Sequence, residues 1–442
     1  MRYIHCWEQV CVSVPRYWAR ISGGVSDVRY IVRIVCSVGA LPFVNAIYGY
    51  FNNRYLPPLI VWAKKNKKIV AGNIIVSTSI AFIYAKLTYM FYGLLNGIFS
   101  MDSIVYITTN TYSFFDAPEN DIRQPLFGVV AGLVYGPFNA IQWFDEKIYA
   151  VFLGMANSVL IIGGLVLLAS GFKKEERKKF LFLGCCMFPT MLFILCIEQY
   201  AVVYFALMLL LYEITQKGGE YAEPYAGAAG ALITSAAALP LCSKKKFLDV
   251  KSMCKCLMTF AGMILIYGRT MIVLDFAHLC VLEKSYTYYG RYTEKLLQYA
   301  NFLHTVFLAP SAHMVINNQG IYEYQLDKID TISITGLILL AVCIFSVVVN
   351  REDKLVKMGA AWSLYSFFIL GILGYGTKDN ILPLYSLYFG WGYWVMIFSG
   401  FRSIKNSKVQ SVLFYSTTTC AGIFNLYNII QIIRMGITYY PV

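Results

Sequence analysis

Residues 69–99 read IVAGNIIVSTSIAFIYAKLTYMFYGLLNGIF, and this stretch decides the fold class of the chain. About 20 consecutive apolar residues are enough for an α-helix to cross the hydrocarbon core of a bilayer. Similar apolar runs recur from near residue 30 to near residue 433. The stretch is therefore predicted to be the first core helix of a protein that crosses a membrane many times.

Composition supports the same fold class. The chain has 442 residues, of which 58% are hydrophobic and only 14% charged, and its mean hydropathy is +0.58. A soluble protein usually carries about 25% charged residues. We expect an all-α, polytopic helical membrane protein with about 10–12 transmembrane or re-entrant helices, forming one integral membrane domain over residues 1–442. Residues 1–28 contain several charges and no continuous apolar core, so this segment is expected to lie on the membrane as an amphipathic helix.

The net charge of +13 arises largely from short clusters of lysine and arginine between the apolar runs. An excess of Lys and Arg in short loops marks the cytoplasmic side of a membrane protein, so the charge does not indicate nucleic-acid binding. Five clusters are predicted to be cytoplasmic: Lys64, Lys65, Lys67 and Lys68; Lys173, Lys174, Arg177, Lys178 and Lys179; Lys244, Lys245, Lys246, Lys251 and Lys255; Arg351, Lys354 and Lys357; and Arg402, Lys405 and Lys408. Residues 98–147, with interfacial helices, and residues 276–329 then form two outer loops.

Apolar runs place the remaining spans. They are expected at residues 30–50, 148–171, 180–196, 200–215, 225–242, 257–275, 331–349, 357–376, 382–401 and 411–433. If every run crosses the membrane once, the basic cluster at residues 244–255 falls on the outer side. One segment between residues 178 and 242 is therefore expected to be re-entrant or broken, as is tolerated where protein encloses the backbone.

The first outer loop concentrates the scarce acids of the chain. Residues 101–130 read MDSIVYITTNTYSFFDAPENDIRQPLFGVV and include Asp102, Asp116, Asp121 and the neighbouring Arg123. A carboxylate at the membrane surface can act as a general base or hold a metal ion. The alternative is a solvated acidic loop that only marks the outer side.

The second outer loop is rich in tyrosine and histidine. Residues 286–292 read YTYYGRY and contain Tyr288, Tyr289 and Arg291, and His304 and His313 follow. Tyrosine faces suit stacking on sugar rings, but an aromatic belt that anchors the protein at the membrane interface explains the same pattern.

Two charged residues lie close to or within predicted spans. Glu198 stands between two apolar runs, and Arg269 lies in the outer half of its span. Charged groups inside a membrane are costly and usually face a cavity or a partner, which favours a site for both residues. Snorkelling of the side chain to the interface is the alternative.

The order of these features resembles the multi-spanning membrane glycosyltransferases of the C-type fold, which include protein O-mannosyltransferases and aminoarabinose transferases. In that family an outward helix ends in an acidic pair, followed by tyrosines and a Pro-Pro-Leu motif. Asp102-Ser103 stands where the pair would be, without its second acid, and Arg123-Gln124-Pro125-Leu126 stands where the Pro-Pro-Leu motif would be. The segments GAAGALITSAAALPLCSKKK (residues 227–246) and NILPLYSLYFGWGYWVMIF (residues 380–398) are also similar to segments of such proteins.

The resemblance implies a reaction. The enzyme would move a sugar from a polyprenyl-phosphate carrier to a glycan, lipid or protein acceptor on the extracytoplasmic side of a bacterial plasma membrane. Asp102 is then the first choice for the general base, with Asp116 and Asp121 next. One carboxylate beside a cationic phosphate site favours inversion at the sugar carbon, since retention usually needs a second carboxylate. Candidates to stabilise the leaving phosphate are Arg123, Arg269, Arg291 and Lys378. No cofactor is expected, and the spacing of the acids does not demand a divalent metal.

Two other classes of function remain open. A lipid-linked polysaccharide polymerase or ligase relies on Arg and His in a long outer loop, which Arg291, His304 and His313 fit. A flippase or secondary transporter usually carries inverted repeats, and the sequence shows no convincing internal symmetry. The chain has no GxxxxGK[ST] motif, which argues against an ATP-driven pump.

Overall fold

The computed structural model describes residues 56–65, 67–68, 71, 146–195, 200–216, 250–252, 254–256, 258, 290–310, 312–316, 322–326, 334–374 and 382–439. Helices make up most of this part of the chain, as the all-α prediction requires. The first outer loop and the span expected at residues 30–50 lie outside the described residues. The spans expected at residues 69–97, 225–242 and 257–275 lie almost wholly outside them.

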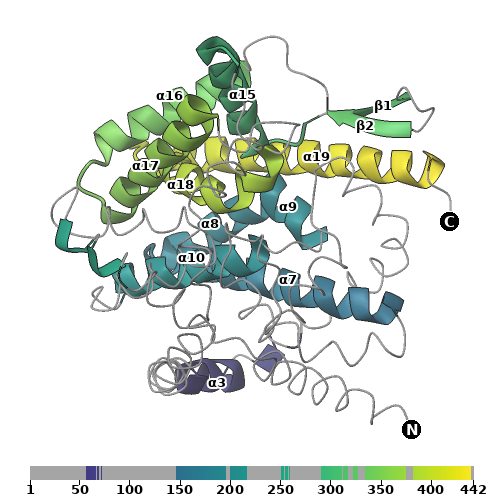
Figure 1. The fold of residues 1–442 in the computed structure, drawn as a ribbon. Coiled ribbons are helices and arrows are strands. Elements are labelled where there is room, and N and C mark those ends of the chain that lie inside the picture. Colours follow the sequence, from purple (N-terminus) through teal and green to yellow (C-terminus); the bar gives the residue numbers. More distant parts are fainter. Residues whose placement is uncertain are drawn as a thin grey trace, which may run out of the picture.

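Most of the described helices coincide with the apolar runs, but the helices at residues 56–65 and 292–305, and the first half of the helix at residues 174–186, lie outside the predicted spans. The described helices are α3 (Leu56–Lys65), α7 (Glu146–Ala169), α8 (Lys174–Cys186), α9 (Phe188–Leu195), α10 (Tyr200–Gln216), α15 (Tyr292–Thr305), α16 (Ile334–Val349), α17 (Lys354–Ser366) with the π-helical η2 (Phe367–Leu373), α18 (Leu382–Arg402) and α19 (Ser407–Tyr439). Figure 1 shows α7 and α10 side by side, with α16, α17 and α18 forming a second group above them.

Among the described residues, one helical stretch, Lys354–Leu373, is both long and apolar enough to cross a membrane. Gly154–Ala169, Tyr200–Gln216 and Ile334–Val349 are apolar but shorter. The helical character of the described apolar runs is therefore confirmed, whereas the number of membrane crossings stays a prediction.

Three of the five basic clusters meet at one end of the bundle, which we call the basic end. The Arg402 guanidinium, at the end of α18, lies 2.8 Å from the Asp353 carboxylate and 3.5 Å from Glu176. This arrangement brings the α7–α8, α16–α17 and α18–α19 connections together. Lys354 also donates a hydrogen bond of 3.1 Å to the Ile214 carbonyl, which places the end of α10 there too. Three of the clusters that the sequence assigns to one side therefore lie together, and their cytoplasmic location stays a prediction.

The helical segment after the α7–α8 connection is broken at Met187, which has an extended backbone conformation between α8 and α9. Pro189 explains the break, because a proline has no N–H to donate to the carbonyl four residues earlier. This break lies within the stretch of residues 178–242, where the sequence predicts a re-entrant or broken segment.

Helix α15 lies inside the predicted outer loop of residues 276–329, yet it enters the bundle. Its first turn is next to the end of η2, because Lys295 donates a hydrogen bond of 3.1 Å to the Leu373 carbonyl. Just past its other end, the Val306 carbonyl accepts a hydrogen bond of 2.9 Å from the indole of Trp394, near the middle of α18. The helix therefore runs from the end of the bundle opposite the basic end to about half its depth.

The same outer loop also contains a β-hairpin, which the all-α prediction did not include. Strand β1 (Ala312–Ile316) pairs antiparallel with β2 (Tyr322–Leu326), with His313 opposite Gln325. Apolar and β-branched residues flank the sequence NNQG at residues 317–320, which is the usual signal for a hairpin. Figure 1 shows the hairpin at the same end of the view as the C terminus.

Helices α17 and α18 cross in close backbone contact at Gly359 and Gly392. A Cβ atom added to Gly392 would lie 2.8 Å from the Gly359 carbonyl oxygen, a contact that requires the backbone to move. Small residues permit this kind of close helix approach.

We expect Gly392→Ala to destabilise the folded protein by about 1–3 kcal/mol, the usual cost of overpacking a core. Gly400→Ala on the same helix is the matched control, because its added methyl group would meet its neighbours at 3.5 Å or more. Thermal unfolding of the detergent-purified protein measures both changes. Equal melting temperatures for the two variants would contradict the close crossing.

Candidate functional site

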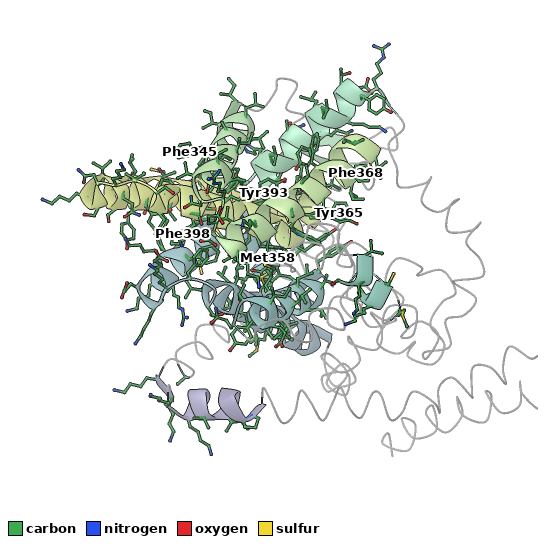
Figure 2. The ribbon with its side chains drawn as sticks, turned by 90° about the vertical axis from the view of Figure 1, so that its left-hand side faces the viewer. Phe345, Met358, Tyr365, Phe368, Tyr393 and Phe398 are labelled. Atoms are coloured by element: carbon green, nitrogen blue, oxygen red, sulfur yellow. The ribbon has the colours of Figure 1, made fainter. Side chains whose placement is uncertain are left out.

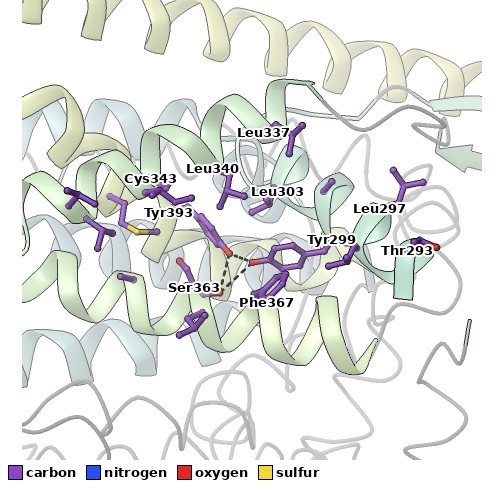
Figure 3. Close-up of a pocket in the computed structure, with 18 residues that line it drawn as sticks. Thr293, Leu297, Tyr299, Leu303, Leu337, Leu340, Cys343, Ser363, Phe367 and Tyr393 are labelled. Atoms are coloured by element: carbon purple, nitrogen blue, oxygen red, sulfur yellow. Dashed lines mark hydrogen bonds between the residues drawn. The ribbon is translucent and has the colours of Figure 1, made fainter. Parts of the chain in front are cut away.

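An apolar groove of about 790 Å³ lies between α15, α16, α17–η2 and α18. Leu303 of α15, Leu340 of α16 and Phe367 of η2 are among the side chains that line it (Figure 3). Ligand pockets in proteins usually occupy about 300–1,000 Å³, so the groove is large enough for a sizeable ligand.

The groove opens onto the outer surface of the bundle. Three of its lining residues are about half exposed: Leu337 at 46%, Ile344 at 58% and Leu364 at 60%. The surface beside it is also apolar, since Phe345 is 56% exposed and Phe368 48% exposed, whereas Tyr393 between the helices is buried (Figure 2). A continuous exposed apolar surface of this kind marks contact with lipid or with another protein.

A small network of hydroxyl groups forms the polar part of the groove. The hydroxyls of Tyr299 on α15 and Tyr393 on α18 hydrogen-bond to each other. The Ser366 hydroxyl lies 3.2 Å from that of Tyr299 and 2.9 Å from that of Tyr393, and both tyrosines also reach the Ser363 carbonyl. Figure 3 shows the two tyrosines pointing toward each other, with Leu337 and Leu340 on one side of them. The network joins three helices and fixes the position of α15.

Lys295 lies on α15 next in sequence to the groove residue Leu296, at the end of the bundle opposite the basic end. The residue is only 9% exposed, and its ammonium donates hydrogen bonds to the Ile372 and Leu373 carbonyls at 3.5 and 3.1 Å. These carbonyls end η2, which stops at Gly374 in the left-handed conformation with a φ of 73°. A cation favours the negative end of a helix, so Lys295 anchors α15 to η2.

The two helix breaks, after α8 and after α15, meet at Asn425 of α19. The Asn425 side chain is fully buried and accepts a hydrogen bond of 2.7 Å from the Ala309 N–H. Its amide donates at 2.8 Å to the carbonyls of Cys186 and Phe307. The Phe188 N–H adds a bond of 3.3 Å to the Phe307 carbonyl. One side chain thus bonds to three backbone groups at the breaks, of which the Phe307 carbonyl also accepts from the Phe188 N–H.

Of the residues that the sequence predicts for the site, three lie in the described part. Arg291 has an exposed side chain and precedes α15, where its N–H bonds to the Glu294 carboxylate at 3.1 Å. His304 is half-buried in the last turn of α15, and His313 lies in β1. Thirteen residues of helix correspond to about 20 Å, so Arg291 and His304 lie at opposite ends of α15 and do not share a small site.

The other predicted site residues lie outside the described residues: Asp102, Asp116, Asp121, Arg123, Glu198, Arg269, Tyr288, Tyr289 and Lys378.

Comparison with protein-family models, with curated proteins and with solved structures found no match. Within the described residues, no three His, Cys, Asp or Glu side chains gather into a group that could hold a metal ion. The groove, the hydroxyl network and Asn425 are features that the sequence did not reveal. The available signals were the two asparagines, Asn425 and Asn428, in the run at residues 411–433 and tyrosines that the pattern assigned to no helix face.

Proposed function

We propose that the chain is a polytopic membrane glycosyltransferase that takes a sugar from a polyprenyl-phosphate carrier and passes it to a glycan, lipid or protein acceptor outside the cytoplasm. The observation that carries the lipid part of this proposal is the apolar groove, which is continuous with the exposed apolar surface of α16 and η2. A long hydrocarbon chain can enter such a groove sideways from the bilayer. The sugar-transfer part rests on the pattern of acids in residues 101–130 and on the family resemblance.

The position of two cationic side chains at one end of α15 supports this assignment. Arg291 and Lys295 lie at the start of α15, at the end of the bundle opposite the basic end, which is the outer end under the positive-inside rule. An isoprenoid chain in the groove would leave its phosphate at that outer end, close to the exposed Arg291 guanidinium. Arginine is well suited to the role because its planar fork makes paired hydrogen bonds with phosphate.

We expect a photoreactive polyprenyl phosphate, with its diazirine in the lipid chain, to label α16 between residues 337 and 348 in nanodiscs. Unlabelled polyprenyl phosphate should compete for this labelling. Ala360→Trp should reduce it at least tenfold, because the indole ring would fill the groove from α17. Peptide mapping by mass spectrometry measures the label.

The exposed face of α19 around Ile423 and Tyr427 is the internal control, because it is apolar but lies outside the groove. Labelling there should be weak and insensitive to competitor. If α16 and α19 are labelled equally, with or without competitor, the groove does not bind the carrier lipid.

A flippase or secondary transporter is the second candidate. The junction at Asn425 favours it, because helices that break halfway through the bundle are typical of transporters. Purified protein in liposomes that moves a lipid-linked sugar across the bilayer without cleaving the sugar–phosphate bond would support the transporter over the transferase.

A further inference from the structure

The basic residues of the basic end divide into two groups, and the first group is directed into the protein. Arg177 donates hydrogen bonds of 3.0 Å to two carbonyls just past the end of α7. Lys354 binds the carbonyl at the end of α10, and Arg402 bridges Asp353 and Glu176. These three side chains hold helix ends together, since cations stabilise the carbonyl ends of helices.

The second group faces outward and is defined by Lys174, Lys178, Lys405 and Lys408. All four are exposed, and their side chains make no hydrogen bond or ion pair within the described part of the chain. The surrounding stretches at residues 173–179, 351–357 and 402–408 contain eleven basic and four acidic residues. The basic end therefore presents a strongly positive surface whose outer lysines are not needed to hold the helices.

Exposed apolar side chains begin directly beside these lysines. Val409 and Val412 follow Lys408 on α19 and are 45% and 67% exposed. On the neighbouring α8, the Lys179 ammonium lies 6.0 Å from the centre of the Tyr415 ring, which is itself exposed on α19. Lysines, then an aromatic ring, then aliphatic side chains follow one another along this surface. This order is typical of the membrane interface, where the lipid headgroups lie.

We propose that Lys174, Lys178, Lys405 and Lys408 bind the phosphate groups of anionic phospholipids in the leaflet that borders the basic end. This inference rests on the membrane location in the proposed function. It concerns the opposite end of the molecule from Arg291, where the phosphate of the carrier lipid is proposed to lie. Each lysine near an anionic membrane surface contributes roughly 1 kcal/mol, or about fivefold in affinity. A soluble acidic partner would need the same charges but not the adjoining apolar surface.

The test uses the full chain in a neutral detergent, titrated with phosphatidylglycerol or phosphatidylcholine. Native mass spectrometry measures the bound lipid. We expect phosphatidylglycerol to bind at least tenfold more tightly than phosphatidylcholine. The Lys178→Gln/Lys405→Gln/Lys408→Gln variant should lose this preference with an unchanged melting temperature.

Two further variants test the role of charge. Replacing the same three lysines with arginine should keep the preference for phosphatidylglycerol. Glu175→Gln should increase it, since this exposed acid lies in the same cluster.

Three outcomes would overturn the proposal. Retention of the preference in the glutamine variant would show that other groups bind the headgroups. Binding of soluble polyglutamate as tightly as phosphatidylglycerol would identify a surface for an acidic protein instead. Release of the native chain from membranes by alkaline carbonate would contradict the membrane location and the proposed function together, whereas loss of lipid preference alone leaves the proposed function untouched.

Discussion

An Asn425→Leu chain is expected to be strongly destabilised. Leucine has nearly the same shape as asparagine, but it cannot accept from the Ala309 N–H or donate to the Cys186 and Phe307 carbonyls. Each buried backbone group left without a partner costs about 1–3 kcal/mol. The Phe307 carbonyl keeps its bond from the Phe188 N–H, so two groups, the Ala309 N–H and the Cys186 carbonyl, lose their partner. The resulting loss of about 2–6 kcal/mol is a large part of the 5–15 kcal/mol that is the typical total stability of a folded domain.

Fluorescence-detected size-exclusion chromatography over a temperature series measures the effect. Asn428→Leu is the matched control, because Asn428 is on the same helix and its amide bonds only to the Phe424 carbonyl of its own helix, at 3.1 Å. Asn425→Asp should also destabilise the protein, since it keeps an acceptor for Ala309 but loses both donated bonds. An Asn425→Leu protein that melts within about 2 °C of the native chain would show that the helix breaks do not depend on this side chain.

The positions of the long helices could be predicted from the sequence because apolar runs mark them directly. The run at residues 331–349 became α16, and the run at 382–401 became α18. The gathering of three basic clusters was also predictable, because lysine and arginine collect in loops on one side. Within the gathered clusters, ion pairs from Arg402 to Asp353 and Glu176 hold the helix connections together.

Helix α15 could not be predicted in the same way. Its sequence, YTEKLLQYANFLHT, is too polar and too short to read as an apolar run. It is buried because of what packs against it: Tyr299 bonds to the hydroxyl of Tyr393, and Phe302 is fully covered. Such burial depends on residues more than 60 positions away, and local patterns contain no information about them.

The candidate site was predictable only in part. Arg291 and His304 were assigned to one outer loop, but the structure places a helix between them that enters the bundle and separates them by about 20 Å. The groove escaped prediction because its leucines and valines are indistinguishable in sequence from residues that face lipid. Its polar network depends on Ser366 and Tyr393, which come from different helices and meet only in the folded protein.

Asp102→Asn is expected to reduce sugar transfer by about 10²–10⁴-fold, the usual effect of removing a general base. Asparagine keeps the size of the side chain but cannot take a proton from the acceptor hydroxyl. Release of polyprenyl phosphate from a sugar-linked carrier, in liposomes with a panel of acceptor glycans, measures turnover. Glu119→Gln in the same loop is the control, and near-native activity is expected for it. Photolabelling of α16 should be unchanged in both variants, because the groove is proposed to bind the lipid chain rather than the acceptor.

Sugar transfer and photolabelling of α16, measured together, distinguish a wrongly assigned base from a wrongly assigned reaction. If Asp102→Asn remains active while Asp116→Asn or Asp121→Asn is inactive, the base belongs to the same loop but was assigned to the wrong acid. If all three variants remain active while the groove still binds the lipid, a carboxylate base in this loop is excluded. A polymerase or ligase then becomes the better explanation, because it also separates the sugar from its lipid carrier but does not require a carboxylate in the first outer loop. A transporter would release no polyprenyl phosphate in this assay, from the native chain or from any variant.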